Sequence, residues 1–200
     1  MAVRMNAPGR PVAILLAAGG GARFGGDKLG AMIGAQTVLE RSAAAVAASG
    51  CRQRVAVVSE KTQMHAPLLS GNGFEIIVNT SAAEGMSSSI RAGFVWAEAK
   101  GAGGALIALA DMPFVPAAHF GRLLETFEQS AIGISCSADA GRRMPPAVFG
   151  SRWFAHLQAL EGDAGARALL DKASAGDVVE AAPCELDDID SQDDLRRFNC

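Results

Sequence analysis

Short apolar segments alternate along the chain with longer segments of helical periodicity. The apolar segments are rich in Val, Ile, Leu and Ala, and continuous runs of this kind are typical of strands that are covered on both faces in a parallel sheet. They lie at residues 12–18, 54–59, 74–78, 105–110 and 132–136. We therefore predict a buried, mainly parallel sheet.

The segments between these runs carry apolar residues at helical spacing. Residues 37–49 precede Gly50 and residues 88–100 precede Gly101, and glycine often follows the last turn of a helix. A third helix is predicted at 117–129. The repeated order of strand, helix and strand favours an α/β three-layer sandwich with a mostly parallel central sheet.

The last quarter of the chain departs from this pattern. Residues 142–149 form an irregular strand that contains Pro145 and Pro146, and prolines confine such a strand to a sheet edge or a bulge. The elements expected beyond it are short helices at 151–160 and 165–175, a brief strand near Val178 and a helix from Ser191. No internal repeat or long linker interrupts the 200 residues, so we predict a single domain.

Composition and charge narrow the function classes. The chain is 50% hydrophobic and 20% charged, which is ordinary globular content. Its 18 basic and 21 acidic residues give a net charge of −3, and the basic residues are scattered. Nucleic acid is therefore an unexpected partner, whereas a small anionic ligand held by a few cations is compatible with this balance. No apolar run approaches the ~18 residues that cross a bilayer, so no membrane association is expected.

The cysteines and the N-terminus point to the cytoplasm. Arg4 and Arg10 precede the apolar run 12–18 as in a signal peptide, but glycines follow that run instead of a cleavage site, so we favour a buried strand. No CxxC pair or metal-ligand spacing is present, which is simplest to explain by reduced thiols in the cytoplasm. The cysteines are Cys51, Cys136, Cys184 and Cys200.

A glycine-rich segment follows the first predicted strand, where open parallel sheets bind ligands. Glycines let backbone amides approach a phosphate chain, and Arg23 and Lys28 supply charged donors to the same anion. The alternative is a flexible connector with two solvated cations. Phe24 breaks a dinucleotide fingerprint, and Leu29 breaks a Walker A motif. The predicted polyphosphate contacts are Ala17, Ala18, Gly19, Gly20, Gly21, Arg23 and Lys28.

Two carboxylates are candidates for a magnesium site. Asp111 directly follows the strand predicted at 105–110, and Mg²⁺ is commonly held by one or two carboxylates together with substrate phosphates. The alternative for Asp111 is an ordinary turn residue. Near the C-terminus, Ser191 and Asp194 fit a capping box, which leaves Asp188 and Asp190 as the second ligand, with Asp190 preferred.

The segment that leads into the second predicted helix carries further nucleotide contacts. Gly85 and Met86 precede three serines, one of which is expected to cap the helix. The others, with the free amides of the helix start, are candidates to bind a base or ribose. Gly85, Met86 and Ser89 are therefore predicted to line the nucleotide site. His65, His119 and His156 fall outside every motif, and we interpret them as ordinary helix or surface residues.

These motifs together resemble the molybdenum cofactor nucleotidyltransferases. The matching segments are Leu16-Ala17-Ala18-Gly19-x-x-x-Arg23-x-Gly25-x-x-Lys28, Gly85-Met86-x-x-Ser89, Asp111-Met112-Pro113, Gly162-Asp163-x-Gly165-Ala166-Arg167 and Asp188-Ile189-Asp190. The start of the glycine segment is most similar to the cytidylyltransferases, because guanylyl-specific members usually carry Leu-Ala-Gly-Gly there. The resemblance covers nearly the whole chain from Val12 to Leu195.

The resemblance implies a Rossmann-like nucleotidyltransferase fold and the transfer of CMP from CTP to molybdopterin or molybdenum cofactor, with Mg²⁺ and release of pyrophosphate. Arg23, Lys28 and Asp111 would be catalytic, and Asp111 and Asp190 would hold the metal. Asp163 and Arg167 would contact the acceptor. A flexible extension at 1–11, a nucleotide-binding half at 12–115 and an acceptor-binding half at 116–200 are expected. A molybdenum hydroxylase or its chaperone would receive the product.

One departure from the family leaves the acceptor open. Where cytidylyltransferases commonly have Gly-His-Pro, this chain has Met144-Pro145-Pro146. A nucleotidyltransferase that acts on a sugar or small alcohol phosphate is therefore the first alternative. An NADPH-dependent reductase on the same scaffold and a non-catalytic cofactor chaperone are the others.

Overall fold

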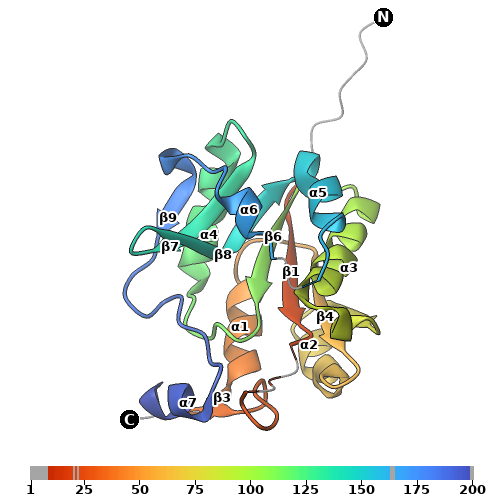
Figure 1. The fold of residues 1–200 in the computed structure, drawn as a ribbon, viewed down its shortest axis with the longest axis vertical. Coiled ribbons are helices and arrows are strands. Elements are labelled where there is room, and N and C mark those ends of the chain that lie inside the picture. Colours follow the sequence, from red (N-terminus) through yellow and green to blue (C-terminus); the bar gives the residue numbers. More distant parts are fainter. Residues whose placement is uncertain (1–8, 20, 22, 163–164, 199–200) are drawn as a thin grey trace, which may run out of the picture.

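The computed structural model describes residues 9–19, 21, 23–162 and 165–198 (Figure 1). Most of the expected N-terminal extension, residues 1–8, lies outside the described part. Gly9 is described, and its carbonyl accepts a hydrogen bond from the amide of Gly103 over 2.8 Å. No described helix is both long enough and apolar enough to cross a membrane.

A seven-stranded sheet forms the centre of the protein, in the order β5-β4-β1-β6-β8-β7-β9. The pairs β1–β4, β1–β6, β4–β5 and β7–β9 are parallel, whereas β8 is antiparallel to both β6 and β7. The strands are β1 (Val12–Ala17), β4 (Arg54–Ser59), β5 (Glu75–Asn79), β6 (Gly104–Leu109), β7 (Ile134–Asp139), β8 (Arg142–Gly150) and β9 (Val178–Glu180). A separate hairpin pairs β2 (Met32–Ile33) with β3 (Gln36–Thr37). The predicted α/β fold with a mostly parallel sheet is confirmed.

Helices cover both faces of the sheet, as Figure 1 shows. Helices α1 (Val38–Ala47) and α4 (Ala117–Gln129) lie on one face, and α3 (Met86–Ala99) and α5 (Phe154–Gln158) lie on the other. The remaining helices are α2 (Ala66–Gly71), α6 (Arg167–Leu170) and α7 (Gln192–Phe198). The sandwich follows from the sequence because the central strands are apolar on both faces and need a cover on each.

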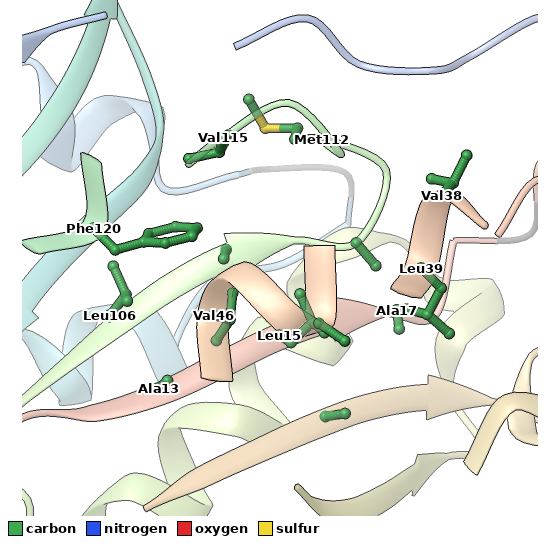
Figure 2. Close-up of a cluster of buried hydrophobic side chains, with 14 of the residues drawn as sticks. Ala13, Leu15, Ala17, Val38, Leu39, Val46, Leu106, Met112, Val115 and Phe120 are labelled. Atoms are coloured by element: carbon green, nitrogen blue, oxygen red, sulfur yellow. The ribbon is translucent and has the colours of Figure 1, made fainter. Parts of the chain in front are cut away.

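Strand β1 contributes alternate side chains to two hydrophobic cores. Ala13, Leu15 and Ala17 belong to the core beneath α1 and α4, which also contains Val38, Leu39 and Val46 of α1 (Figure 2). Ile14 belongs to the core beneath α3 and α5. All six residues of β1 are buried, so the apolar run 12–18 is a core strand in the structure, as expected.

The position of β8 corrects one expectation. The prolines were expected to place this strand at an edge or in a bulge, and the strand is in fact internal, between β6 and β7. The pairing with β7 shifts from Cys136↔Ala147 to Ser137↔Met144. Pro145 and Pro146 fall in that bulge, where the ladder does not require their missing N–H groups. The bulge was therefore predicted correctly and the edge was not.

Helix boundaries differ from the sequence prediction in several places. Helix α3 begins at Met86, and its N-cap is Gly85 with φ 108°, so no serine side chain caps it. Helix α6 covers only part of the segment predicted at 165–175. The predicted helix at 151–160 is divided into a 3₁₀ turn and α5. Propensity places such short helices poorly, because their ends are fixed by the contacts of the loops around them.

Candidate active site

The glycine-rich loop leaves β1 at the carboxyl edge of the sheet and folds back on itself. Gly21 and Gly25 have positive φ values of 55° and 75°, a conformation that glycine adopts without steric cost. The amide of Phe24 donates to the Gly21 carbonyl over 2.9 Å, and the Phe24 ring is buried in the core. The loop is thereby anchored on an apolar side chain. Of the predicted contacts, Gly20 lies outside the described residues.

Lys28 reaches from this loop to two aspartates on other segments. Its Nζ donates to Asp111 Oδ2 over 2.7 Å and to Asp190 Oδ1 over 3.1 Å, and only 7% of the residue is exposed. Burial acts to lower the pKa of Lys28, but the charges and hydrogen bonds of Asp111 and Asp190 outweigh it, so the pKa lies above its ordinary value. Lys28 is therefore a cation held between two carboxylates.

The C-terminal segment that carries Asp190 is fixed beside the end of β6. The amide of Ile189 donates to the Asp111 carbonyl over 2.9 Å, and the Asp194 carboxylate accepts from the Ser191 amide and hydroxyl over 2.7 Å each. The expected capping box is thus present, with the Asp194 amide donating back to Ser191 Oγ over 3.2 Å. These contacts direct Asp190 toward Lys28.

Asp188 and Arg23 lie at the margin of this cluster. Asp188 is exposed at the surface, and desolvation together with the negative charges of Asp190 and Asp111 raises its pKa. Arg23 Nη1 lies 3.1 Å from Asp190 Oδ2, with 84% of its side chain exposed. So exposed an ion pair contributes little to stability and leaves the guanidinium free to bind an anion.

A cavity of 310 Å³ opens beside this cluster, between the glycine loop and the start of α3. It brings together six of the predicted residues, Ala18, Gly19, Gly85, Met86, Ser89 and Asp111, with Leu16, Ala82 and Leu109. Gly21 and Lys28 line an adjoining cavity of 220 Å³ that also includes Gly19. Ala17, by contrast, is buried in the core at the end of β1, so its side chain does not reach this space.

The start of α3 is held in place by Asn79 at the end of β5. Asn79 Nδ2 donates to Ser88 Oγ over 2.8 Å and to Ser89 Oγ over 2.9 Å. Ser88 in turn donates to the Gly85 carbonyl over 2.8 Å. Ser89 is therefore positioned at the cavity by a buried amide, which sequence reasoning missed because Asn79 ends an otherwise apolar strand.

A second cavity, of 240 Å³, adjoins the first and shares Leu16, Met86 and Leu109 with it. Arg167, one of the predicted acceptor contacts, lines it together with Arg142 and Arg143. The other, Asp163, lies outside the described residues. Except for Ala17 and Arg23, the predicted nucleotide and acceptor residues that the structure describes therefore line adjoining cavities.

Two histidines have contacts that the sequence did not indicate. His65 Nε2 lies 2.9 Å from Asp27 Oδ1 in the glycine loop. His119, on α4, is fully buried. No motif marks either residue, so their roles follow only from the three-dimensional contacts.

His119 connects α4 to the bulge of β8. Arg122 Nη2 lies 2.9 Å from His119 Nδ1, and because arginine only donates, Nδ1 accepts and the ring proton is on Nε2. Nε2 donates to Ser137 Oγ over 2.7 Å, and Ser137 Oγ donates to the Pro146 carbonyl over 2.7 Å. The Glu185 carboxylate lies 3.7 Å from His119 Nδ1. This chain of hydrogen bonds fixes the strand that bounds the second cavity.

The donor set suits a metal that is shared with a nucleotide. Within the described residues, no group of three or more His, Cys, Asp or Glu side chains is arranged to hold a metal by itself. Two carboxylate oxygens, one each from Asp111 and Asp190, face the same point at Lys28 Nζ. Mg²⁺ usually takes one or two carboxylates and completes its shell with water and phosphate oxygens. The residues therefore fit a magnesium ion that arrives with its substrate.

Comparison with known proteins adds a family to this geometry. A family model described as MobA-like NTP transferase domain matches residues 13–178. The purine catabolism protein PucB of Bacillus subtilis (strain 168) is 31% identical over 196 residues, which cover 92% of this chain and 93% of PucB.

Solved structures show the same fold. A nucleotidyl transferase from Methanothermobacter thermautotroptrophicus (Mth528) superimposes with a TM-score of 0.79 at 23% identity, covering 95% of this chain and 96% of that one. Rv0371c of Mycobacterium tuberculosis H37Rv, in a complex with manganese, gives a TM-score of 0.72 at 24% identity, covering 94% and 97%.

Proposed function

The chain belongs to the MobA-like NTP transferase family, and on that premise we propose that it transfers CMP from CTP to molybdopterin or molybdenum cofactor and releases pyrophosphate. The observation that carries the proposal is the convergence of Lys28, Asp111 and Asp190, from three distant segments, beside a cavity lined by glycines. A buried cation between two partly exposed carboxylates, beside glycines that let backbone amides approach a ligand, suits a polyphosphate with its counter-ion.

The reaction is a displacement at the α-phosphorus of the nucleotide. A terminal phosphate oxygen of the acceptor forms the new bond, the bond from the α-phosphorus to the oxygen that bridges it to the β-phosphorus breaks, and pyrophosphate leaves with the electron pair. A phosphate nucleophile is already ionised at neutral pH, so no general base is required. The protein's task is to neutralise charge and align the two reactants.

Each charged residue has a distinct part in this scheme. Lys28 stabilises the negative charge that builds on the leaving pyrophosphate, and exposed Arg23 closes on the same phosphates. Asp111 and Asp190 would hold Mg²⁺, which when bound would supply Lewis-acid stabilisation to the phosphate oxygens. Lys28 is paired with both carboxylates in this structure, and with Asp111 and Asp190 neutralised by a bound metal it would be available to donate to the nucleotide phosphates.

The identity of the nucleotide and the identity of the acceptor are supported by different observations. The sequence Ala17-Ala18-Gly19 resembles the cytidylyl branch of the family, which favours CTP. PucB takes its name from purine catabolism, and a molybdenum hydroxylase of such a pathway would be a fitting recipient of the product. The manganese in the mycobacterial structure supports use of a divalent ion.

The test is to incubate the protein with Mg²⁺, molybdopterin and each of the four nucleoside triphosphates in turn, and to follow pyrophosphate. The proposal predicts release with CTP, dependent on both molybdopterin and Mg²⁺. Release with GTP instead would move the protein to the guanylyl branch. Release that requires a sugar phosphate instead of molybdopterin would replace the acceptor and retain the chemistry.

A further inference from the structure

His65 contacts the glycine loop from a different part of the chain. Its Nε2 lies 2.9 Å from Asp27 Oδ1, and 38 positions separate the two residues in the sequence. An ionised carboxylate only accepts hydrogen bonds, so the imidazole donates through Nε2. Only 13% of the His65 side chain is exposed, against 42% of the Asp27 side chain. A mostly buried histidine therefore holds a carboxylate of the loop.

The loop has little other support where Asp27 lies. Phe24 and Leu29 anchor it in the core on either side. Between these anchors, Gly25 and Gly26 are exposed, and a Cβ added to either glycine would meet nothing within 4 Å. Packing therefore does not fix this stretch, and its conformation depends on the side chain of Asp27.

Asp27 directly precedes Lys28, so its position affects where the lysine begins. Asp27 Oδ1 also accepts from the Gly30 amide over 3.1 Å. The Lys28 amide donates to the Gly26 carbonyl over 3.0 Å. The chain thus turns tightly around Lys28, and the bond from His65 ties this turn to a separate segment.

The contact also requires the absence of a side chain at Gly30. A Cβ there would overlap Asp27 Oδ2 and would lie 3.4 Å from His65 Cε1. Gly30 does not have a positive φ, so its backbone does not demand glycine. The space beside Asp27 is what an added side chain would fill.

The same contact joins two walls of the 220 Å³ cavity. Asp27 and Lys28 line the cavity from the loop, and Thr62 and Met64 line it from the segment after β4. His65 ends the 3₁₀ turn in that segment and is not among the lining residues. The segment is fixed to the sheet, because the amide of Ser59 at the end of β4 donates to Thr62 Oγ1 over 2.9 Å.

We propose that His65 is a positioning residue for Lys28. Its hydrogen bond to Asp27 holds the loop in the conformation from which Lys28 reaches Asp111 and Asp190. The consequence for phosphate binding rests on the function proposed above. The effect of His65 on the loop itself does not depend on that function.

Hydrogen exchange of residues 24–29 tests the loop conformation without any ligand. Exchange in His65→Ala should be about threefold to tenfold faster than in the wild type, the usual effect of losing one hydrogen bond. His65→Gln retains a side-chain N–H donor and should restore slow exchange. Gln63→Ala, at an exposed position of the same turn, is the matched control and should change nothing. Exchange in His65→Ala equal to that of the wild type would overturn the proposal.

Gly30→Ala disrupts the same contact while His65 stays intact. The added Cβ displaces the Asp27 carboxylate, so exchange of residues 24–29 should accelerate at least as much as in His65→Ala. The double variant G30A/H65A should exchange no faster than Gly30→Ala alone, because both substitutions remove one shared contact. Effects that multiply in the double variant would overturn the proposal.

Turnover provides the readout that a general loss of structure would not reproduce. His65→Ala should lower kcat/KM for CTP about threefold to tenfold and leave KM for molybdopterin unchanged, because Lys28 acts on the nucleotide phosphates. Equal losses toward both substrates would overturn the proposal. If the wild type released no pyrophosphate from any triphosphate, the proposed function would fail, and hydrogen exchange would still decide whether His65 positions the loop.

Discussion

Lys28 Nζ lies 2.7 Å from Asp111 Oδ2, although 83 residues separate them in the sequence. The same nitrogen lies 3.1 Å from Asp190 Oδ1, and Asp190 follows Lys28 by 162 positions in the sequence. One buried cation therefore joins the glycine loop, the end of β6 and the C-terminal segment. Its charge holds the two carboxylates in the positions from which they can receive a metal.

Removing the charge of Lys28 should lower turnover and strengthen the binding of Mg²⁺. Lys28→Met should lower turnover about a hundredfold or more, the usual cost of losing one preorganised donor to developing charge. The two carboxylates would also lose their counter-charge, so Mg²⁺ alone should raise the melting temperature of the variant more than that of the wild type. Lys172→Met, at an exposed site, is the matched control. Equal Mg²⁺ responses in Lys28→Met and wild type would contradict this interpretation of the cluster.

Substitution of Asp190 and of Asp188 should change the Mg²⁺ requirement of the enzyme to different extents. Asp190 contacts Lys28 at 3.1 Å, whereas no hydrogen bond or ion pair joins Asp188 to Lys28 among the described residues. Asp190→Asn should therefore raise the Mg²⁺ concentration for half-maximal activity about tenfold or more, and Asp188→Asn should raise it less. The reverse order would make Asp188 the metal ligand.

The close packing of α3 against β1 should require the absence of a side chain at Gly93. A Cβ at Gly93 would lie 2.5 Å from Ile14 Cγ2, whereas one at Gly121 on α4 would meet nothing within 4 Å. Gly93→Ala should lower the free energy of unfolding by about 1–3 kcal/mol. Gly121→Ala should raise it by about 0.5–1 kcal/mol, because alanine favours the helix. Urea denaturation of the pair measures both, and similar values for the two variants would exclude close packing at Gly93.

Nucleotide binding should respond to the same change, because α3 carries Ser89. Gly93→Ala shifts the helix away from the sheet, so CTP affinity should fall in that variant and stay unchanged in Gly121→Ala. Full CTP affinity in folded Gly93→Ala would show that the start of α3 does not bind the nucleotide.

His119 should make stability depend on pH. Burial lowers its pKa from the ordinary value of 6.5, Arg122 lowers it further, and Glu185 acts in the opposite sense. The unfolded chain then binds more protons than the native protein, so stability falls as the pH drops through about 6.5 toward the lowered value. When the pH is lowered from 7.5 to 5.5, the melting temperature of His119→Gln should fall less than that of the wild type. Parallel pH profiles would remove His119 from this role.

The site at the carboxyl edge of the sheet could be predicted from the sequence because the residues that carry its chemistry come directly after strands. Asp111 comes immediately after an apolar run, and the glycine loop follows another. Parallel strands bring such positions together whatever the intervening length. The capping box left Asp188 and Asp190 as candidates, of which Asp190 was preferred, and the structure places the Asp190 carboxylate at Lys28.

The remaining contacts depend on tertiary packing that local patterns do not encode. His119 and Ser137 meet only because α4 packs on β7. The internal position of β8 was missed because proline disfavours an internal strand, and the bulge that accommodates the prolines is visible only in the register with β7. The second cavity, of 240 Å³, is likewise lined by residues from four separate elements, β6, β8, α3 and α6.

Lys28, Asp111 and Asp190 are proposed to act together on one nucleotide. The most direct measurement is pyrophosphate release from CTP, with Mg²⁺ and molybdopterin, by the wild type and by Asp111→Asn, with CTP binding measured alongside. We expect rapid release by the wild type, and release about a hundredfold or more slower by Asp111→Asn, which should still fold and bind CTP. Equal rates for the two proteins, or no release from any nucleoside triphosphate by the wild type, would contradict it.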